Sequence, residues 1–214
     1  ASCRPILHNA RYAERLCPNP MLAWKRGLDE GRSSWAGPRL RERRMEMTMA
    51  TQTALTMLLQ HDLWANLRLI DLCAGLTDEQ LDAGAPGTFG SVRDTLAHII
   101  AAECRYAAAL AGTALPALPA PDDAFIGFDT LRDFARWSGE TLVGAASEID
   151  SAGNVSAQGL WHDEPFSFPA VHFVIQAINH ATEHRAQIKM ILTQQGVEPP
   201  ELDGWEYLPI LAAG

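Results

Sequence analysis

The sequence lacks any run of about 18 or more apolar residues, the length needed to cross a bilayer, which excludes a membrane-spanning helix. Its first residues hold no apolar segment of the kind found in signal peptides, so we do not expect secretion. Cysteine is sparse, with four residues and no C-x-x-C pair. Cys73 and Cys104 lie within apolar helical patterns, where cysteines are usually reduced core residues. We therefore expect a cytoplasmic protein.

Positive charge is scarce beyond residue 48. Residues 1–48 hold 10 of the 17 lysine and arginine residues and 5 of the 26 aspartate and glutamate residues, which leaves 7 basic and 21 acidic residues in the rest. Such an acidic body repels a phosphate backbone, so it is not expected to bind nucleic acid. With 47% apolar and 20% charged residues, the chain has the composition of a globular protein.

Residues 1–48 show no sustained helical or strand period and contain prolines at positions 5, 18, 20 and 38. So short a proline-broken segment cannot bury its own core, and we expect a poorly ordered basic leader before a domain at 49–214. One alternative is a basic arm that touches an acidic partner through Arg39, Arg41, Arg43 and Arg44. A mitochondrial transit peptide is another, which the acidic residues of the segment disfavour.

Four long segments beyond residue 50 carry apolar residues at helical spacing. They run from about Thr51 to Gly75, from Ser91 to about Ala111, from Asp129 to about Ile149, and from about Ala170 to Gln195. The two later connections are longer and contain prolines, and the second of them allows a short hairpin near residues 160–168. The prediction is an all-α fold, an antiparallel four-helix bundle with longer crossover connections.

His180 and His184 form the strongest local signal for chemistry. They are four residues apart in the fourth predicted helix, so their imidazoles lie on one face, in a row shared with apolar residues. Two neutral imidazoles can bind one cation such as Zn²⁺, Ni²⁺ or Fe²⁺. The alternative is a pair of hydrogen-bonded structural histidines. A zincin-type protease is disfavoured because Ala181, not glutamate, follows the first histidine.

A metal site would need a third ligand, for which His98 in the middle of the second helix is the main candidate. Periodicity leaves its orientation open, because the apolar stripe of that helix lies on a different arc. His61, His162 and His172 are further candidates. His61 replaces an apolar residue in the first helix, His162 lies in a predicted loop, and His172 lies two turns before His180.

Three segments, matching in order across roughly residues 52–210, resemble the DinB/YfiT-like family. They are His61–Leu69 with its Trp-Ala-Asn sequence, Ser91–Ile99, and Ile178–Ile188. The resemblance implies a four-helix bundle, usually a homodimer, with one divalent metal ion bound by His98, His180 and His184. Zinc is the expected ion, and nickel and iron are alternatives. Ala186 departs from the family pattern, which commonly has glycine at that position.

A site with three protein ligands keeps a coordination position open, where a cation can lower the pKa of a bound thiol or water. The family includes transferases that use low-molecular-weight thiols. We therefore expect a metal-dependent enzyme that joins a small thiol to an electrophile in detoxification or stress response. The alternatives are a non-catalytic metal-binding stress protein and a metal-hydroxide hydrolase.

The remaining functional residues are less well defined by the sequence. No general base is identified, although Glu103, on the inner arc of the second helix, is a candidate. His61, Trp64 and Asn66 are candidates for lining the pocket, and a tryptophan in such a position is often simply part of the core.

Overall fold

The computed structural model describes residues 53–119, 125–152, 156–161 and 164–213. The expected leader at 1–48 lies outside these residues. The helices in the described part are α4 (Ala54–Cys73), α5 (Asp78–Leu81), α6 (Val92–Ala111), α7 (Phe128–Ala152), α8 (Val171–Gln194) and α9 (Gly204–Ala213). The predicted all-α fold is confirmed, and its four long helices lie where the apolar spacing placed them.

Local side chains explain where several helices begin and end. Thr53 and Ser91 cap α4 and α6, since their hydroxyl oxygens accept hydrogen bonds from the backbone N–H groups three residues further on. Thr77 and Gln80 form a capping box that starts the short α5. Gly112 ends α6 with a φ of 63°, a left-handed conformation that glycine adopts without a steric penalty.

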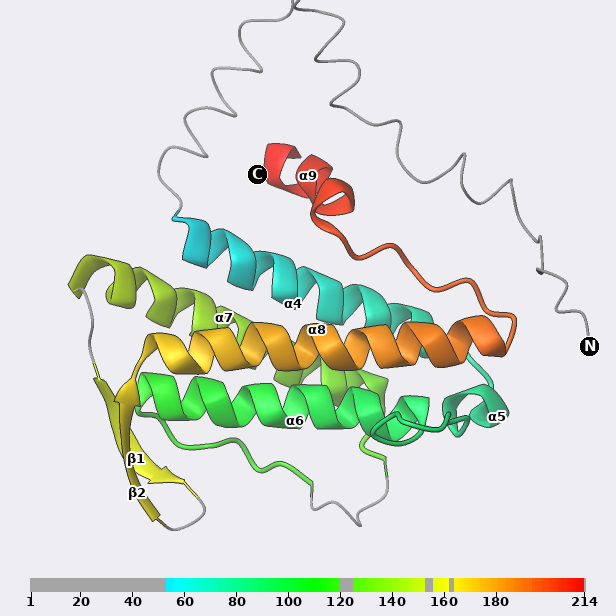
Figure 1. The fold of residues 1–214 in the computed structure, drawn as a ribbon, viewed down its shortest axis with the longest axis horizontal. Helices are drawn as coiled ribbons and strands as arrows, with labels where there is room; N and C mark the ends of the chain where they lie inside the picture. The colour runs from blue at the N-terminus through cyan, green and yellow to red at the C-terminus, as the bar shows by residue number, and fades with distance from the viewer. Residues whose placement is uncertain (1–52, 120–124, 153–155, 162–163, 214) are drawn as a thin grey trace, which may run out of the picture. The chain divides into compact units, whose positions relative to one another are not determined.

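The four long helices form a closed ring in which α4 contacts α7 and α8, and α6 contacts the same two helices. Figure 1 shows α4 and α8 running in one direction and α6 and α7 in the other. Neighbours are therefore antiparallel in the pairs α4–α7 and α6–α8 and parallel in the other two. This order needs the long connection between α6 and α7, because α7 begins at the end of the bundle where α6 also began.

A short hairpin precedes α8. Strand β1 (Ser156–Trp161) pairs antiparallel with β2 (Glu164–Pro169), with Ser156 opposite Pro169. This confirms the hairpin that the sequence allowed, while His162 lies outside the described residues. The hairpin contacts α6 and α8 and lies at the end of the bundle where α6 ends and α8 begins (Figure 1).

The core consists of two apolar clusters along the bundle. One contains Leu69, Ile99 and Leu131 near the α5 end, and the other contains Leu59 and Leu142 near the hairpin end. Between them the helices bury a layer of polar side chains: Asp62, Asn66, Glu103, Ser138 and Arg185. Burying polar groups lowers the stability of the fold unless they are hydrogen-bonded or paired, so the contacts within this layer determine its free-energy cost.

The buried thiols and the last helix complete the described part. Cys73 and Cys104 are free and buried, as expected of reduced core cysteines. Helix α9 packs on α4 through Tyr207, whereas Trp205 is 68% exposed. Within the described ranges, no helix combines the length and the apolar character that crossing a bilayer requires.

Candidate metal centre

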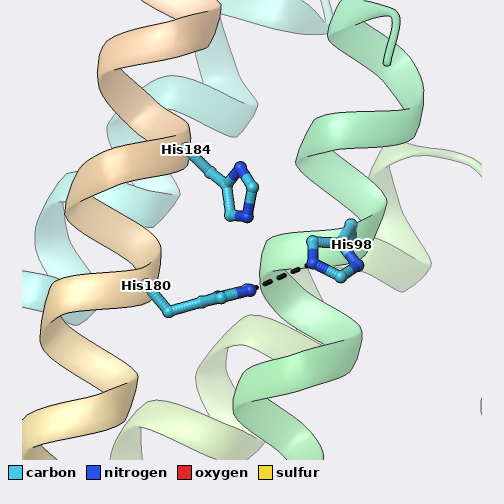
Figure 2. Close-up of side chains that lie close together, drawn as sticks. All are labelled: His98, His180 and His184. Carbon is cyan, nitrogen blue, oxygen red and sulfur yellow. Dashed lines mark hydrogen bonds between the residues drawn. The ribbon is translucent and has the colours of Figure 1, made fainter. Parts of the chain in front are cut away.

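His98 on α6 faces His180 and His184 on the neighbouring helix α8 (Figure 2). One nitrogen from each of the three imidazoles lies within 4.8 Å of the other two. The Nε2 atoms of His98 and His180 are 3.0 Å apart, and the ring centroids of His180 and His184 are 4.5 Å apart. The α6–α8 contact therefore gathers three nitrogen donors at one point, with one donor from α6 and two from successive turns of α8.

The donor set fits a divalent cation. Nitrogens that bind one zinc ion at about 2.0–2.1 Å lie about 3.3 Å from each other in a tetrahedral site. The 3.0 Å separation between His98 and His180 is close to this value. Imidazole is a suitable ligand for zinc, nickel and iron alike, so the residues fit a metal without selecting one ion.

The surroundings of the histidines favour their neutral, metal-binding form. Burial lowers the pKa of His98 to about 4, helped by the neighbouring His180, His184 and Arg105. Burial also lowers the pKa of His180, with a further contribution from His184. A protonated imidazolium must lose one proton to become a neutral imidazole before a ring nitrogen can bind a metal. His98 and His180 are therefore prepared for a cation at neutral pH.

Aromatic rings border the three histidines. Phe89, in the connection before α6, stacks on His98 with ring centroids 3.9 Å apart and planes at 19°. Tyr106, two turns further along α6, meets His180 edge-on at 6.0 Å. Tyr106 also borders a cavity of about 280 Å³, whose other lining residues are Phe168, His172, Phe173 and Gln176. Tyr106 therefore lies between the cavity and His180.

His61 and Trp64, two of the candidate pocket residues, lie beside the C-terminal segment. His61 places its Nε2 2.9 Å from the Leu202 carbonyl oxygen and, with Trp64, packs against Tyr207 of α9. These two side chains therefore hold the C-terminal segment on α4 and do not line the cavity. The sequence could not show this, because it depends on where the segment after α8 returns to the bundle.

Asn66 and Glu103 belong to the buried polar layer. The Asn66 side-chain amide donates to Glu103 Oε2 at 2.6 Å and accepts from Arg185 Nη1 at 2.7 Å, while Ser138 Oγ donates to Glu103 Oε1 at 3.1 Å. Glu103 is five residues after His98, about 140° around the helix, so its carboxyl group faces the bundle interior. It therefore does not face the histidines as a general base would.

Burial, together with the charge of Asp62, raises the pKa of Glu103 to about 8. The contacts accommodate a protonated carboxyl group. Ser138 Oγ lies 3.1 Å from Glu103 Oε1 and 3.2 Å from the Ala135 carbonyl oxygen. When Glu103 is ionised, Ser138 Oγ donates to it; a protonated Glu103 can instead donate to Ser138 Oγ while the Ser138 hydroxyl donates to the Ala135 carbonyl oxygen. The layer therefore carries a single ion pair, between Asp62 and Arg185, when Glu103 is neutral.

Comparison with known proteins gives the family. The model of the DinB family matches residues 47–210. The chain belongs to the DinB family. A solved structure similar to this DinB protein is a DinB-like protein from Bacillus cereus ATCC 10987, with 21% sequence identity, a TM-score of 0.44, and coverage of 66% of this chain and 91% of that chain. No curated protein matches the chain.

The family assignment confirms the resemblance drawn from the three sequence segments. In this DinB protein, His98, His180 and His184 form a group that can hold a metal ion. Sequence reasoning missed Phe89 and Tyr106 as neighbours of the group. Phe89 lies outside any periodic segment, and Tyr106 reads as an ordinary core residue of an apolar helix.

Proposed function

We propose that this DinB protein is a metal-dependent enzyme that transfers a low-molecular-weight thiol to an electrophilic substrate in detoxification or stress response. The observation that carries the proposal is the group of three half-buried imidazoles from two helices. Tyr106, whose ring contacts His180, also lines a cavity of about 280 Å³. A divalent cation held by three imidazoles would keep a position free and favour the thiolate form of a small thiol there. We propose zinc as the ion, with nickel and iron(II) as alternatives.

The thiol in this proposal comes from a small molecule. Burial raises the pKa of both Cys73 and Cys104 to about 12, so these two cysteines stay protonated at neutral pH. The sulfur lone pair of the incoming thiolate would form the new bond to the electrophilic carbon, and the leaving group would depart with its bonding electrons. No charged side chain from the described residues needs to act as the nucleophile.

The cavity beside Tyr106 suits the acceptor. Its wall combines the rings of Tyr106, Phe168 and Phe173 with the polar side chains of His172 and Gln176. An apolar lining with a few polar groups is typical of small-molecule sites. We propose that it holds the apolar part of the electrophile while the reacting carbon points towards the histidines. A structural metal would be sealed from solvent, whereas His98, His180 and His184 are only half-buried, and this partial exposure favours an open site over a purely structural one.

Elemental analysis of protein purified without chelator or added metal is the first test, and about one equivalent of a transition metal is expected. The second test replaces the ion with Co²⁺ and adds a series of small thiols, and a thiolate-to-cobalt charge-transfer band is expected. The third measures turnover of a thiol with the electrophile monochlorobimane. Metal without thiol binding, but with ester hydrolysis, would support the hydrolase alternative. Metal without either activity would support a non-catalytic metal-binding protein.

We also propose a homodimer, as the family resemblance implies. Of the alanines on α6, Ala102 and Ala108 are buried within their own bundle, whereas Ala101 and Ala109 are half-buried. Light scattering at micromolar concentration decides the matter. A mass close to the 23.4 kDa of one chain would contradict the dimer.

A further inference from the structure

We infer that Gln187 is a positioning residue of the histidine group. Its side-chain oxygen sets the tautomer of His184 and also fixes Phe89 against His98. Gln187 Oε1 lies 3.0 Å from His184 Nδ1 and 3.1 Å from the backbone nitrogen of Phe89. The Gln187 side-chain oxygen thus contacts both His184 on α8 and the segment before α6 that contains Phe89. The expected effect of Gln187 on metal affinity rests on the proposed metal centre, whereas its two contacts are features of the structure itself.

The Phe89 contact identifies the amide atom. A backbone N–H can only donate a hydrogen bond, so the Gln187 atom that it meets must be the oxygen and not the nitrogen. The orientation of the amide group, often ambiguous for glutamine, is therefore fixed by a partner outside α8. The same oxygen then faces His184.

The oxygen in turn fixes the proton on His184. A carbonyl oxygen accepts and cannot donate, so His184 Nδ1 must carry the proton in this contact. In a neutral imidazole the other nitrogen, Nε2, then keeps the lone pair. Among histidine ligands, a hydrogen bond from the second ring nitrogen commonly sets both tautomer and ring orientation. Gln187 therefore prepares His184 to bind a cation through Nε2.

The second contact acts on His98. Phe89 is 53% exposed, although its ring stacks on His98 and meets His184 edge-on at 5.5 Å. Its backbone N–H bond to Gln187 holds this ring in place from α8. The preceding turn is tied as well, because Thr88 Oγ1 donates to the Ala85 carbonyl oxygen at 2.7 Å. Gln187 thus restrains one ligand directly and a second through Phe89.

Sequence spacing explains why Gln187 can do this. It follows His184 by three residues on α8, so the two side chains are neighbours on one face. Glutamate at this position would keep an acceptor of the same length, whereas methionine would keep the length and lose the acceptor. These two changes separate hydrogen bonding from packing.

The test compares Gln187→Glu and Gln187→Met with Gln194→Met, a change of an exposed glutamine on the same helix. Long-range nitrogen–proton NMR on the metal-free proteins reports the tautomer of each histidine. We expect the Nδ1–H form of His184 in the wild type, in Gln187→Glu and in Gln194→Met, and a mixture in Gln187→Met. Metal affinity should fall about 10–100-fold in Gln187→Met only, the usual effect of losing such an outer hydrogen bond.

Two outcomes would overturn the inference. One is the Nε2–H form of His184 in the wild type, and the other is a Gln187→Met variant that equals the wild type in both tautomer and affinity. If Gln187→Met does not fold, the inference is tested by two other results: the Nδ1–H tautomer of His184 in the wild type, and a metal affinity of Gln187→Glu equal to that of the wild type. Failure of either result would overturn it. A second variant, Phe89→Ala, should leave the His184 tautomer unchanged because the backbone N–H remains. Failure to find thiol transfer would affect only the proposed function, since the tautomer is measured without metal or thiol.

Discussion

Arg185 of α8 forms an ion pair with Asp62 of α4 inside the bundle, with Nη1 2.7 Å from Oδ1 and side chains only 6% and 2% exposed. Arg185 directly follows His184, so one turn of α8 directs the His184 imidazole towards α6 and the Arg185 guanidinium into the core. Arg185 also donates to Asn66 and Thr182. Asp62 Oδ2 is buried and has no hydrogen-bond partner among the residues that the structure describes. Burial raises the pKa of Asp62, although Arg185 opposes the shift.

The first prediction is that Arg185→Met strongly destabilises the protein. It leaves the Asp62 carboxyl group buried without its cation, and breaking a buried pair in this way costs about 3–5 kcal/mol. Adding Asp62→Asn to the Arg185→Met variant should recover part of the loss, because the unpaired charge is removed. Urea unfolding of the two single variants and the double variant measures the coupling.

The matched control is Arg136→Met, since Arg136 pairs with Asp133 on the surface at 3.6 Å. An exposed pair of this kind contributes at most about 1 kcal/mol. If Arg185→Met cost no more than this control, the buried layer would have little part in stability.

The second prediction concerns pH. Since the pKa of Glu103 is raised from 4.5 to about 8, the folded protein holds a proton that the unfolded chain has already lost across that interval. Folding stability then falls as pH rises from 4.5 to about 8, by about 1.4 kcal/mol for each pH unit at most. Glu103→Gln removes this slope and can keep the contacts with Asn66 and Ser138.

Urea unfolding between pH 6.5 and 8 checks the slope in both proteins. Measurements are kept above pH 6.5 because, at lower pH, the lowered pKa of His98 makes folding stability rise with pH, opposite to the effect of Glu103. The folded state resists protonation of His98 between about 4 and 6.5, so that contribution to stability is lost as pH falls. Equal slopes in the wild type and Glu103→Gln above pH 6.5 would show that Glu103 is ionised in the fold.

The third prediction uses two glycines of α7. A Cβ atom on Gly139 would come within 2.7 Å of Leu63 Cδ1 and 2.9 Å of Leu63 Cβ, whereas a Cβ on Gly144 would meet nothing within 4 Å. Gly139→Ala should therefore cost about 1–3 kcal/mol through overpacking. Gly144→Ala should stabilise by about 0.5–1 kcal/mol, because alanine favours the helix without a clash. Thermal melting of both variants tests this, and a Gly139→Ala variant as stable as Gly144→Ala would contradict the close contact.

Much of the fold was predictable because apolar spacing and capping residues act locally. Ser91 and Gly112 bound α6 where a second helix was expected. The buried polar layer was not predictable in the same way. Asn66 was a candidate for lining a pocket, and the hydrogen bond that it accepts from Arg185 depends on the mutual rotation of α4 and α8, which no local pattern gives.

The histidine group shows the same limit. The spacing of His180 and His184 fixes their common face on α8, but no local pattern fixes the orientation of His98. In the structure His98 is half-buried at the edge of the α6 core face, where that helix meets α8. A helix with two neighbours has a wide buried arc, so its apolar stripe does not mark every inward residue. The prediction that His98 joins His180 and His184 therefore came from the resemblance to the family and not from the periodicity.

The last prediction addresses the three histidines individually. His98→Ala, His180→Ala and His184→Ala should each lose most of the bound metal, since two imidazoles hold an ion poorly against water. His172→Ala is the control, because His172 is exposed and lines the cavity two turns of α8 from His180. It should keep the metal and instead raise the KM for the electrophile. Metal content by elemental analysis and thiol-transfer kinetics measure the two effects. If His172→Ala lost the metal while His98→Ala kept a full equivalent, the third ligand would be His172, and the 3.0 Å contact between His98 and His180 would be an ordinary hydrogen bond.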